Sequence, residues 1–177
     1  VHSLNKVVNK DIKEQITVIL LVDCLPVNFM NLIEDSLRNF GFSRHALEYR
    51  FAPLPTATAF SKPLLISGTW SDQDNNYEKS IKRRSKSEWD DRNTIYVSNL
   101  KKLADLYIPN GTTIILFNYI DCDDLLHEDF ISKNTSYEEE LHKVLTRISE
   151  SISQLFKKWI GPRENINMQI VTDHGAC

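Results

Sequence analysis

Three apolar runs along the chain have the pattern of strands that are covered on both faces. Ile16–Val22 (ITVILLV) is nearly continuous and mostly β-branched, and Thr112–Ile120 (TTIILFNYI) repeats that pattern. Ile166–Thr172 (INMQIVT) is shorter and more polar. Because strands of parallel sheets are buried on both faces, such runs predict the centre of a mostly parallel sheet. Ile95–Val97 and the alternating stretch His45–Phe51 predict two further short strands.

Apolar residues at helical spacing fall between these strands. Phe29–Phe40 keeps one apolar face and is followed by Gly41, and Leu100–Tyr107 predicts a short helix. Tyr137–Trp159 is the longest predicted helix, and the Gly-Pro pair at 161–162 stops it. The alternation of strands and helices predicts an α/β fold, a three-layer sandwich with a mainly parallel central sheet.

Length and charge pattern predict one domain with one atypical segment. The chain has 177 residues, which fits a single domain over residues 1–177. Residues 69–93 are polar and rich in charge, and they predict a surface insertion or a mobile helical arm. The basic run Lys82–Lys86 in this segment is typical of a solvated face, and it would contact the backbone of a nucleic acid if that were the substrate.

Composition excludes several classes of protein. Hydrophobic residues make up 41% and charged residues 25%, which excludes a disordered or collagen-like chain. The net charge of −3 provides no general attraction to polyanions, and no apolar run approaches the roughly 20 residues of a membrane span. The three cysteines lack CxxC spacing, and no secretory signal is visible, so we expect a cytoplasmic protein. The missing initiator Met predicts a fragment of a longer chain.

Three predicted strands are followed by an aspartate: Asp23, Asp121 and Asp173. A parallel sheet brings such residues to one edge, where α/β folds bind ligands. Clustered carboxylates repel one another unless a cation neutralises them. His174 follows Asp173, and His127 lies downstream of Asp121, and mixed Asp and His ligands suit zinc or manganese better than calcium. A single aspartate after a strand more often caps a helix, so the alternative of a structural role stays open.

The segment Leu54–Gly68 (LPTATAFSKPLLISG) places threonine hydroxyls at a loop-to-helix junction. A hydroxyl there could act as a metal-bound nucleophile, with the helix N-terminus helping to hold a phosphate. The same Pro-Thr-x-Thr pattern is also common in segments that only cap a helix.

Taken together, these segments resemble the PglZ domain of the alkaline phosphatase superfamily. The resemblance runs over residues 16–177 and rests on four motifs in order: Asp23, the Leu54–Gly68 box, Asn118–Asp121 (NYID) and the Asp-His-Gly at 173–175. It implies an alkaline-phosphatase-like fold of which this chain is the N-terminal portion. Relatives in that family include phage-defence (BREX) proteins and effector domains of bacterial response regulators.

The resemblance implies a phosphodiesterase or nuclease with two divalent metal ions, zinc first and manganese second. Thr58 aligns with the nucleophile, with Thr56 as the alternative. Asp23, Thr58, Asp173 and His174 would hold one metal. Asp121 and His127 would hold the other, with Asp123 as the alternative to Asp121. Lys62 would contact a phosphate oxygen of a phosphodiester or nucleic-acid substrate.

One departure from the family supports a second hypothesis. The superfamily completes its second metal site with a histidine well downstream of Asp-His-Gly, and this chain ends at Cys177. The chain would then be a catalytically incomplete module that serves as scaffold or interaction domain, with protein partners in a larger assembly. A receiver-like regulatory domain, which also gathers aspartates at strand ends, is a third hypothesis that strand order distinguishes.

Overall fold

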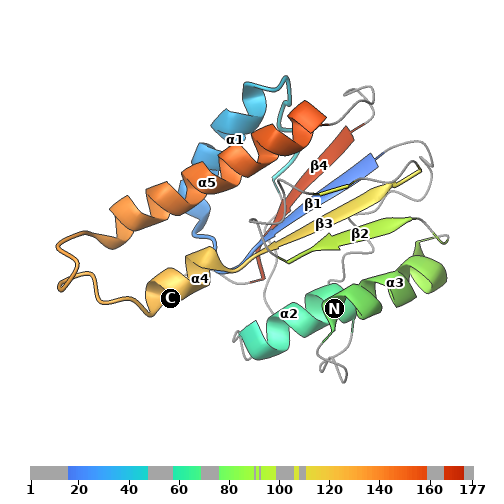
Figure 1. Ribbon diagram of the computed structural model, residues 1–177, viewed down its shortest axis with the longest axis horizontal. Helices are drawn as coiled ribbons and strands as arrows, with labels where there is room; N and C mark the ends of the chain where they lie inside the picture. The colour runs from blue at the N-terminus through green and yellow to red at the C-terminus, as the bar shows by residue number, and fades with distance from the viewer. Residues whose placement is uncertain are drawn as a thin grey trace.

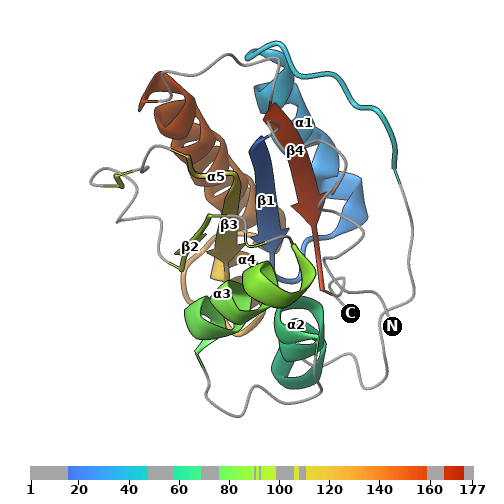
Figure 2. The ribbon, with the colours of Figure 1, turned by 90° about the vertical axis from the view of Figure 1, so that its right-hand side faces the viewer.

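A central sheet of four parallel strands organises the described part of the molecule. The computed structural model describes residues 16–47, 58–68, 76–89, 91, 93–98, 106–107, 111–158 and 166–173. The strands are β1 (Ile16–Val22), β2 (Thr94–Val97), β3 (Ile114–Tyr119) and β4 (Ile166–Val171), in the order β2-β3-β1-β4. The carboxyl ends of all four therefore lie at one edge of the sheet (Figure 2).

Helices cover both faces of this sheet, as the alternating sequence pattern predicts (Figure 1). A short 3-10 helix (η2, Val27–Phe29), α1 (Met30–Arg38) and α5 (Tyr137–Lys158) lie on one side. The helices α2 (Thr58–Ser67) and α3 (Tyr77–Glu88) lie on the other. The short helix α4 (Asp121–Leu126) follows β3 directly and contacts α5. The prediction of an α/β sandwich with a parallel sheet is confirmed.

Strand alternation divides the core into two hydrophobic clusters, one on each face of the sheet. Val18, Leu20 and Val22 of β1 belong to the cluster under α1 and α5. Ile19 and Leu21 belong to the cluster under α2 and α3, which also contains Ile66, Ile81, Trp89, Ile114 and Leu116. Successive residues of β1 are thus buried on opposite faces, which explains why its sequence is continuously apolar.

Within the segment predicted as a surface insertion or a mobile helical arm, residues 77–88 form the helix α3, which packs against α2 and β2. Its inner face includes Ser80, Arg84 and Ser85 beside Ile81, so burial does not follow an apolar pattern in the sequence. Arg84 is 1% exposed and donates from Nη1 to the backbone oxygens of Leu65 and Ile66 at 3.0 and 2.5 Å.

Arg84 therefore joins the last turn of α2 to α3. A cation beside the C-terminal carbonyls of a helix is favourable, because those groups lack partners within the helix. The guanidinium also lies over the Trp89 ring, 5.1 Å from its centroid. This contact fixes the position of α2, the helix that begins at Thr58.

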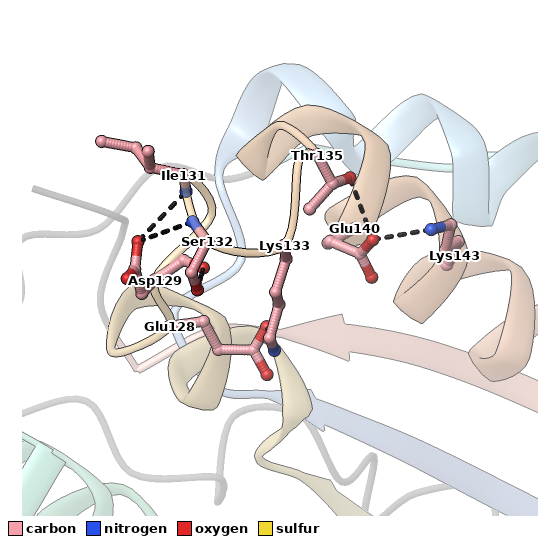
Figure 3. Close-up of polar contacts among 8 residues, drawn as sticks. All are labelled: Glu128, Asp129, Ile131, Ser132, Lys133, Thr135, Glu140 and Lys143. Atoms are coloured by element: carbon pink, nitrogen blue, oxygen red, sulfur yellow. Dashed lines mark hydrogen bonds and ion pairs between the residues drawn. The ribbon is translucent and has the colours of Figure 1, made fainter.

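A polar turn connects α4 to α5 (Figure 3). The carboxylate of Asp129 accepts hydrogen bonds from the backbone N–H groups of Ile131 and Ser132 at 3.1 and 3.2 Å. Further contacts are the ion pairs Lys133–Glu128 and Lys143–Glu140 and the hydrogen bond from the Thr135 hydroxyl to Glu140. Ile131 is 94% exposed at the tip of this turn.

The other predictions have mixed outcomes. Residues 45–47 form no strand, and 48–51 lie outside the described residues. Residues 106–107 are not helical, and 100–105 also lie outside the described residues.

The strand order contradicts the hypothesis of a receiver-like domain. A receiver-like sheet has the order 2-1-3-4-5, whereas here β3 lies between β2 and β1. Among the described residues, no helix is both long and apolar enough to cross a membrane.

Candidate functional site

Asp23 and Asp173 lie side by side at the carboxyl edge of the sheet. In the pairing of β1 with β4, Leu21 is opposite Val171, and each aspartate comes two residues after its member of that pair. Both residues are buried, with 1% and 6% of their surface exposed. The strand-end pattern in the sequence therefore predicted a contact between residues that are 150 positions apart. Two carboxyl groups in contact within a buried site need hydrogen-bond donors or a cation.

Donors from two other elements hold Asp173. The backbone N–H of Cys24 donates to Asp173 Oδ1 at 3.5 Å, and the hydroxyl of Ser61 in α2 donates to Oδ2 at 3.4 Å. In the same turn, the N–H of Leu25 donates to the hydroxyl of Thr172 at 3.2 Å. Cys24 has a φ of 56°, a left-handed conformation that costs a non-glycine residue roughly 1 kcal/mol or more. This strained turn directs the N–H of Cys24 toward Asp173.

Lys62 reaches into the site from α2 and forms an ion pair with Asp23. The lysine is 3% exposed, so both members of the pair are buried. The sequence predicted that Lys62 contacts a substrate phosphate, whereas in this structure its ammonium contacts a carboxylate of the protein itself. A buried ion pair of this kind is retained only where each charge has its partner, because removing one partner leaves an uncompensated charge.

The electrostatics of the pair depend on the second aspartate. Burial raises the pKa of the Asp23 carboxyl above its ordinary value, the hydrogen bond from Lys62 opposes this rise, and the neighbouring Asp173 adds to it. Among the described residues, the Lys62 ammonium lies against Asp23, and Asp173 lies beside that pair. A bound cation would favour the ionised form of both carboxyl groups.

Thr58 begins α2, three and four positions before Ser61 and Lys62. Residues at this spacing share one face of a helix. The backbone thus places Thr58 on the face from which α2 contacts Asp173 and Asp23; the Thr58 side chain is outside the described part of the structure. Thr56 and His174 also lie outside the described residues.

Asp121 and His127 lie at opposite ends of α4. Asp121 is half-buried in the first turn, and His127 is exposed at the C-terminal cap. Six residues correspond to about 240° around a helix axis, so these two positions do not share a face, whereas Asp123 and His127 are four apart and do. Helical geometry thus favours Asp123 as the partner of His127. Within the described ranges no group of three or more His, Cys, Asp or Glu side chains could hold a metal ion.

The buried thiol of Cys122 is influenced by the charges of both Asp121 and Asp23. Burial raises the pKa of the Cys122 thiol to about 12, and the nearby charges of Asp121, Cys24 and Asp23 contribute to that rise. Asp121 also adds to the raised pKa of the buried Tyr119 hydroxyl, for which burial is the main cause. The acidic start of α4 is thus electrostatically close to the β1 turn.

Asn118, the first residue of the Asn118–Asp121 motif, also lies at this edge of the sheet, and the motif predicted no individual role for it. Ile114 and Leu116 of β3 face α2 and α3, and Asn118, two positions further on, lies on the same face. The residue is 9% exposed, and its Nδ2 donates to the Tyr96 hydroxyl at 3.0 Å, while Oδ1 has no hydrogen-bond partner among the described atoms. An amide within the run TTIILFNYI was the available signal.

The described donors fit part of a metal site. Asp23 and Asp173 supply carboxylate oxygens, which suit a divalent cation, and Lys62 places one positive charge beside Asp23. No protein-family model matches the chain, and a search of curated proteins finds no match.

Proposed function

We propose that this chain carries the site of a metal-dependent phosphoesterase, a phosphodiesterase or nuclease of the PglZ type with an alkaline-phosphatase-like fold. The observation that supports the proposal is the meeting of Asp23 and Asp173, from separate strands, beneath the helix that begins at Thr58. Thr58 is the nucleophile, and the substrate is a phosphodiester. This is the same combination of carboxylates and a hydroxyl that the sequence motifs predict.

Each described residue of the site has a distinct part in this chemistry. Ser61 and the N–H of Cys24 orient the Asp173 carboxyl, and the Lys62 ammonium orients Asp23. Asp23, Thr58, Asp173 and His174 would hold one divalent ion, and Asp123 or Asp121 with His127 the other. Bound ions would lower the pKa of the attacking hydroxyl and stabilise the leaving oxygen. The partial positive charge at the start of α2 favours a phosphate group there.

The reaction on the chain then has two displacements. The Oγ atom of Thr58 forms a bond to phosphorus while the bond from phosphorus to the first alcohol breaks, and that alcohol leaves with a proton. Water next attacks the phosphothreonine, which releases the phosphomonoester and restores the threonine hydroxyl. The protein's own contribution is to hold the two carboxyl groups and the hydroxyl in one place.

The first prediction tests the nucleophile. Thr58→Ala removes the attacking oxygen, so hydrolysis of bis(p-nitrophenyl) phosphate in zinc or manganese should fall about a thousandfold or more. Thr146→Ala is the matched control, because Thr146 is exposed on α5, and it should retain full activity. Release of nitrophenolate is the measurement. Equal rates for wild type and Thr58→Ala would refute the proposal.

A second function is favoured by the Lys62–Asp23 contact. An ammonium that already neutralises Asp23 is the arrangement expected of a site that has lost a metal, and the chain would then be a scaffold or interaction module in a bacterial phage-defence or signalling assembly. This reading predicts that the protein binds neither zinc nor manganese by equilibrium dialysis and hydrolyses no phosphodiester.

A further inference from the structure

A cavity lies over β2, the strand at the opposite side of the sheet from β4. It is formed by the start of α3 and the end of β2, two elements that pack against each other (Figure 1). Its volume of about 430 Å³ falls within the range of small-molecule sites. Its walls include the rings of Tyr77 and Tyr96, the apolar Val97 and Leu106, and the acidic Glu78. None of these residues belongs to the Asp23 site, so the ligand of this cavity is a separate question from the proposed hydrolysis.

Two tyrosine rings form one corner of this cavity. Tyr77 lies in the first turn of α3 and Tyr96 in β2, and their ring centroids are 6.4 Å apart with an angle of 65° between the ring planes. Both residues are partly buried. The face of an aromatic ring carries partial negative charge and attracts cations, and aromatic walls of this kind recognise alkylated ammonium groups. The rings therefore favour a cation over an anion.

Glu78 adds a negative charge to the same cavity. Of the described residues that line the cavity, Glu78 alone carries a formal charge at neutral pH. Its carboxylate contributes to the raised pKa of the Tyr96 hydroxyl, for which burial is the main cause, so this charge is electrostatically close to the ring. Arg84, further along α3, is buried against the end of α2 instead. The charge of the cavity wall thus has the same preference as its aromatic rings.

Lys82 is the competitor of a cation bound at Glu78. Its ammonium donates to Glu78 Oε1 at 2.6 Å from one turn along α3. Both side chains are exposed, and an exposed ion pair contributes little to stability because water screens it. A cation held by the tyrosine rings as well as by Glu78 has the additional contacts needed to displace Lys82.

Hydrogen bonds hold both rings in place. The Tyr96 hydroxyl accepts from Nδ2 of Asn118 in the neighbouring strand β3 at 3.0 Å. The Asn76 side chain accepts from the N–H of Lys79 at 3.0 Å and so caps the turn of α3 that carries Tyr77. Walls that are positioned before a ligand arrives lower the entropy cost of binding.

We infer that the cavity of Tyr77, Tyr96 and Glu78 binds a small organic cation with an alkylated ammonium group. The charged head lies against the two rings with Glu78 as its counter-ion, and its alkyl groups contact Val97 and Leu106. A magnesium or calcium ion does not suit these walls, because it needs six or more oxygen ligands. The inference is independent of the proposed function.

Isothermal titration calorimetry of the full chain without metal, with choline and with 3,3-dimethylbutan-1-ol, tests the inference. The two ligands have the same shape, and they differ in charge because carbon replaces the nitrogen of choline. We expect choline to bind about tenfold more tightly, between the effects of exposed and of buried cation–π contacts. Tyr77→Leu and Tyr96→Leu should each abolish this preference, whereas Tyr77→Phe, which keeps an aromatic face, should retain it.

Two variants of exposed residues test the charge even if Tyr96→Leu fails to fold. Glu78→Gln removes the counter-ion and should weaken choline binding several-fold without affecting the uncharged ligand. Lys82→Met removes the competing ammonium and should strengthen choline binding. Glu128→Gln is the matched control, because it breaks a similar ion pair with Lys133 in the turn between α4 and α5, and it should change neither affinity.

A short peptide with one trimethyl-lysine distinguishes two sources of the same head group. If the natural ligand is a free cation, the peptide should bind more weakly than choline, because its backbone does not fit the cavity. Tighter binding of the peptide would identify a modified lysine side chain of another protein as the source.

Some outcomes would overturn the inference. Equal binding of choline and 3,3-dimethylbutan-1-ol would show that the cavity does not select a cation. A preference that survives both Tyr77→Leu and Glu78→Gln would show that choline binds elsewhere. Neither result affects the phosphoesterase proposal, which depends on the separate Thr58→Ala measurement.

Discussion

The contact between Lys62 and Asp23 imposes two opposite demands on the site. Without metal, the ammonium is the cation that permits Asp23 to be buried next to Asp173. If a divalent ion bound Asp23, as proposed, the same ammonium would lie close to it and repel it. Lys62 would then be available to contact the phosphate, the role that the sequence predicted for it.

Lys62→Met separates the effect of Lys62 on stability from its effect on metal binding, and it is a prediction at the scale of one residue. In metal-free protein the variant should lose about 3 kcal/mol of unfolding free energy, because a buried carboxylate is left without its partner. The same variant should bind manganese more tightly than wild type. Urea unfolding and calorimetry are the two measurements.

Lys82→Met is the matched control for Lys62→Met. Lys82 is exposed and pairs with Glu78 on the surface of α3, so its removal should change the unfolding free energy by less than about 1 kcal/mol and leave manganese binding unchanged. Weaker manganese binding by Lys62→Met would contradict a competition between the Lys62 ammonium and the metal ion for Asp23.

The thiol of Cys122 provides a prediction about pH. Its folded-state pKa is raised to about 12 from an ordinary value of 9.0, so the folded state resists ionisation of the thiol. The contribution of this buried thiol to the free energy of unfolding is fully present below about pH 9 and should be lost as pH rises from 9 toward 12. In a Cys177→Ser chain, Ellman's reagent at pH 8 should therefore react with Cys24 and Cys122 only after urea unfolding. Fast reaction of the folded protein would contradict the burial of these thiols.

At the residue scale, the sequence indicated the position of Asp23 and Asp173 because both follow apolar strands. The partner of Asp23 was not predictable in the same way, since Lys62 is 39 residues away and its partner depends on how α2 docks. Asn118 belongs to the Asn118–Asp121 motif but received no role of its own, because an amide in a strand has no pattern that distinguishes a site residue from a structural one.

At the scale of elements, contacts with α3 fix the position of α2. The guanidinium of Arg84 binds two carbonyls at the end of α2, and Ser61 and Lys62 near the start of α2 contact the aspartates. The apolar strands and α5 were predicted because each has a clear hydrophobic period. The packing of α3 was not predicted because its buried face carries polar side chains, among them Arg84, whose partners lie on α2.

Arg84→Met tests this link between helices. The variant should lose about 2–4 kcal/mol of unfolding free energy, because the buried carbonyl of Ile66 and the partly buried carbonyl of Leu65 lose their donor and the Trp89 ring loses its cation. Phosphodiester hydrolysis should fall with it, since α2 carries Thr58. Arg83→Met, one position away and exposed, is the matched control and should be neutral in both assays. Unchanged stability of Arg84→Met in urea unfolding would show that α2 is held by other contacts.

At the scale of the whole molecule, the sheet order places β1, the strand that leads to Asp23, between β3 and β4, which come much later in the chain. The sequence predicted a parallel sheet but not this order, because apolar runs of similar composition specify burial and not neighbours. Only the register shows that Asp23 meets Asp173 and that Asn118 lies one strand away.

This order has a consequence for how the protein is made. Among the described strands, β1 is synthesised first and β4 last, yet the N–H of Cys24 just after β1 bonds to the Asp173 carboxylate just after β4, 149 residues downstream. Contacts between such distant segments form late, because closing a long loop costs chain entropy before any contact is gained. A nascent chain therefore carries β1 with one edge of backbone groups unpaired until β4 has been made, and Asp23 and Asp173 meet only after that point.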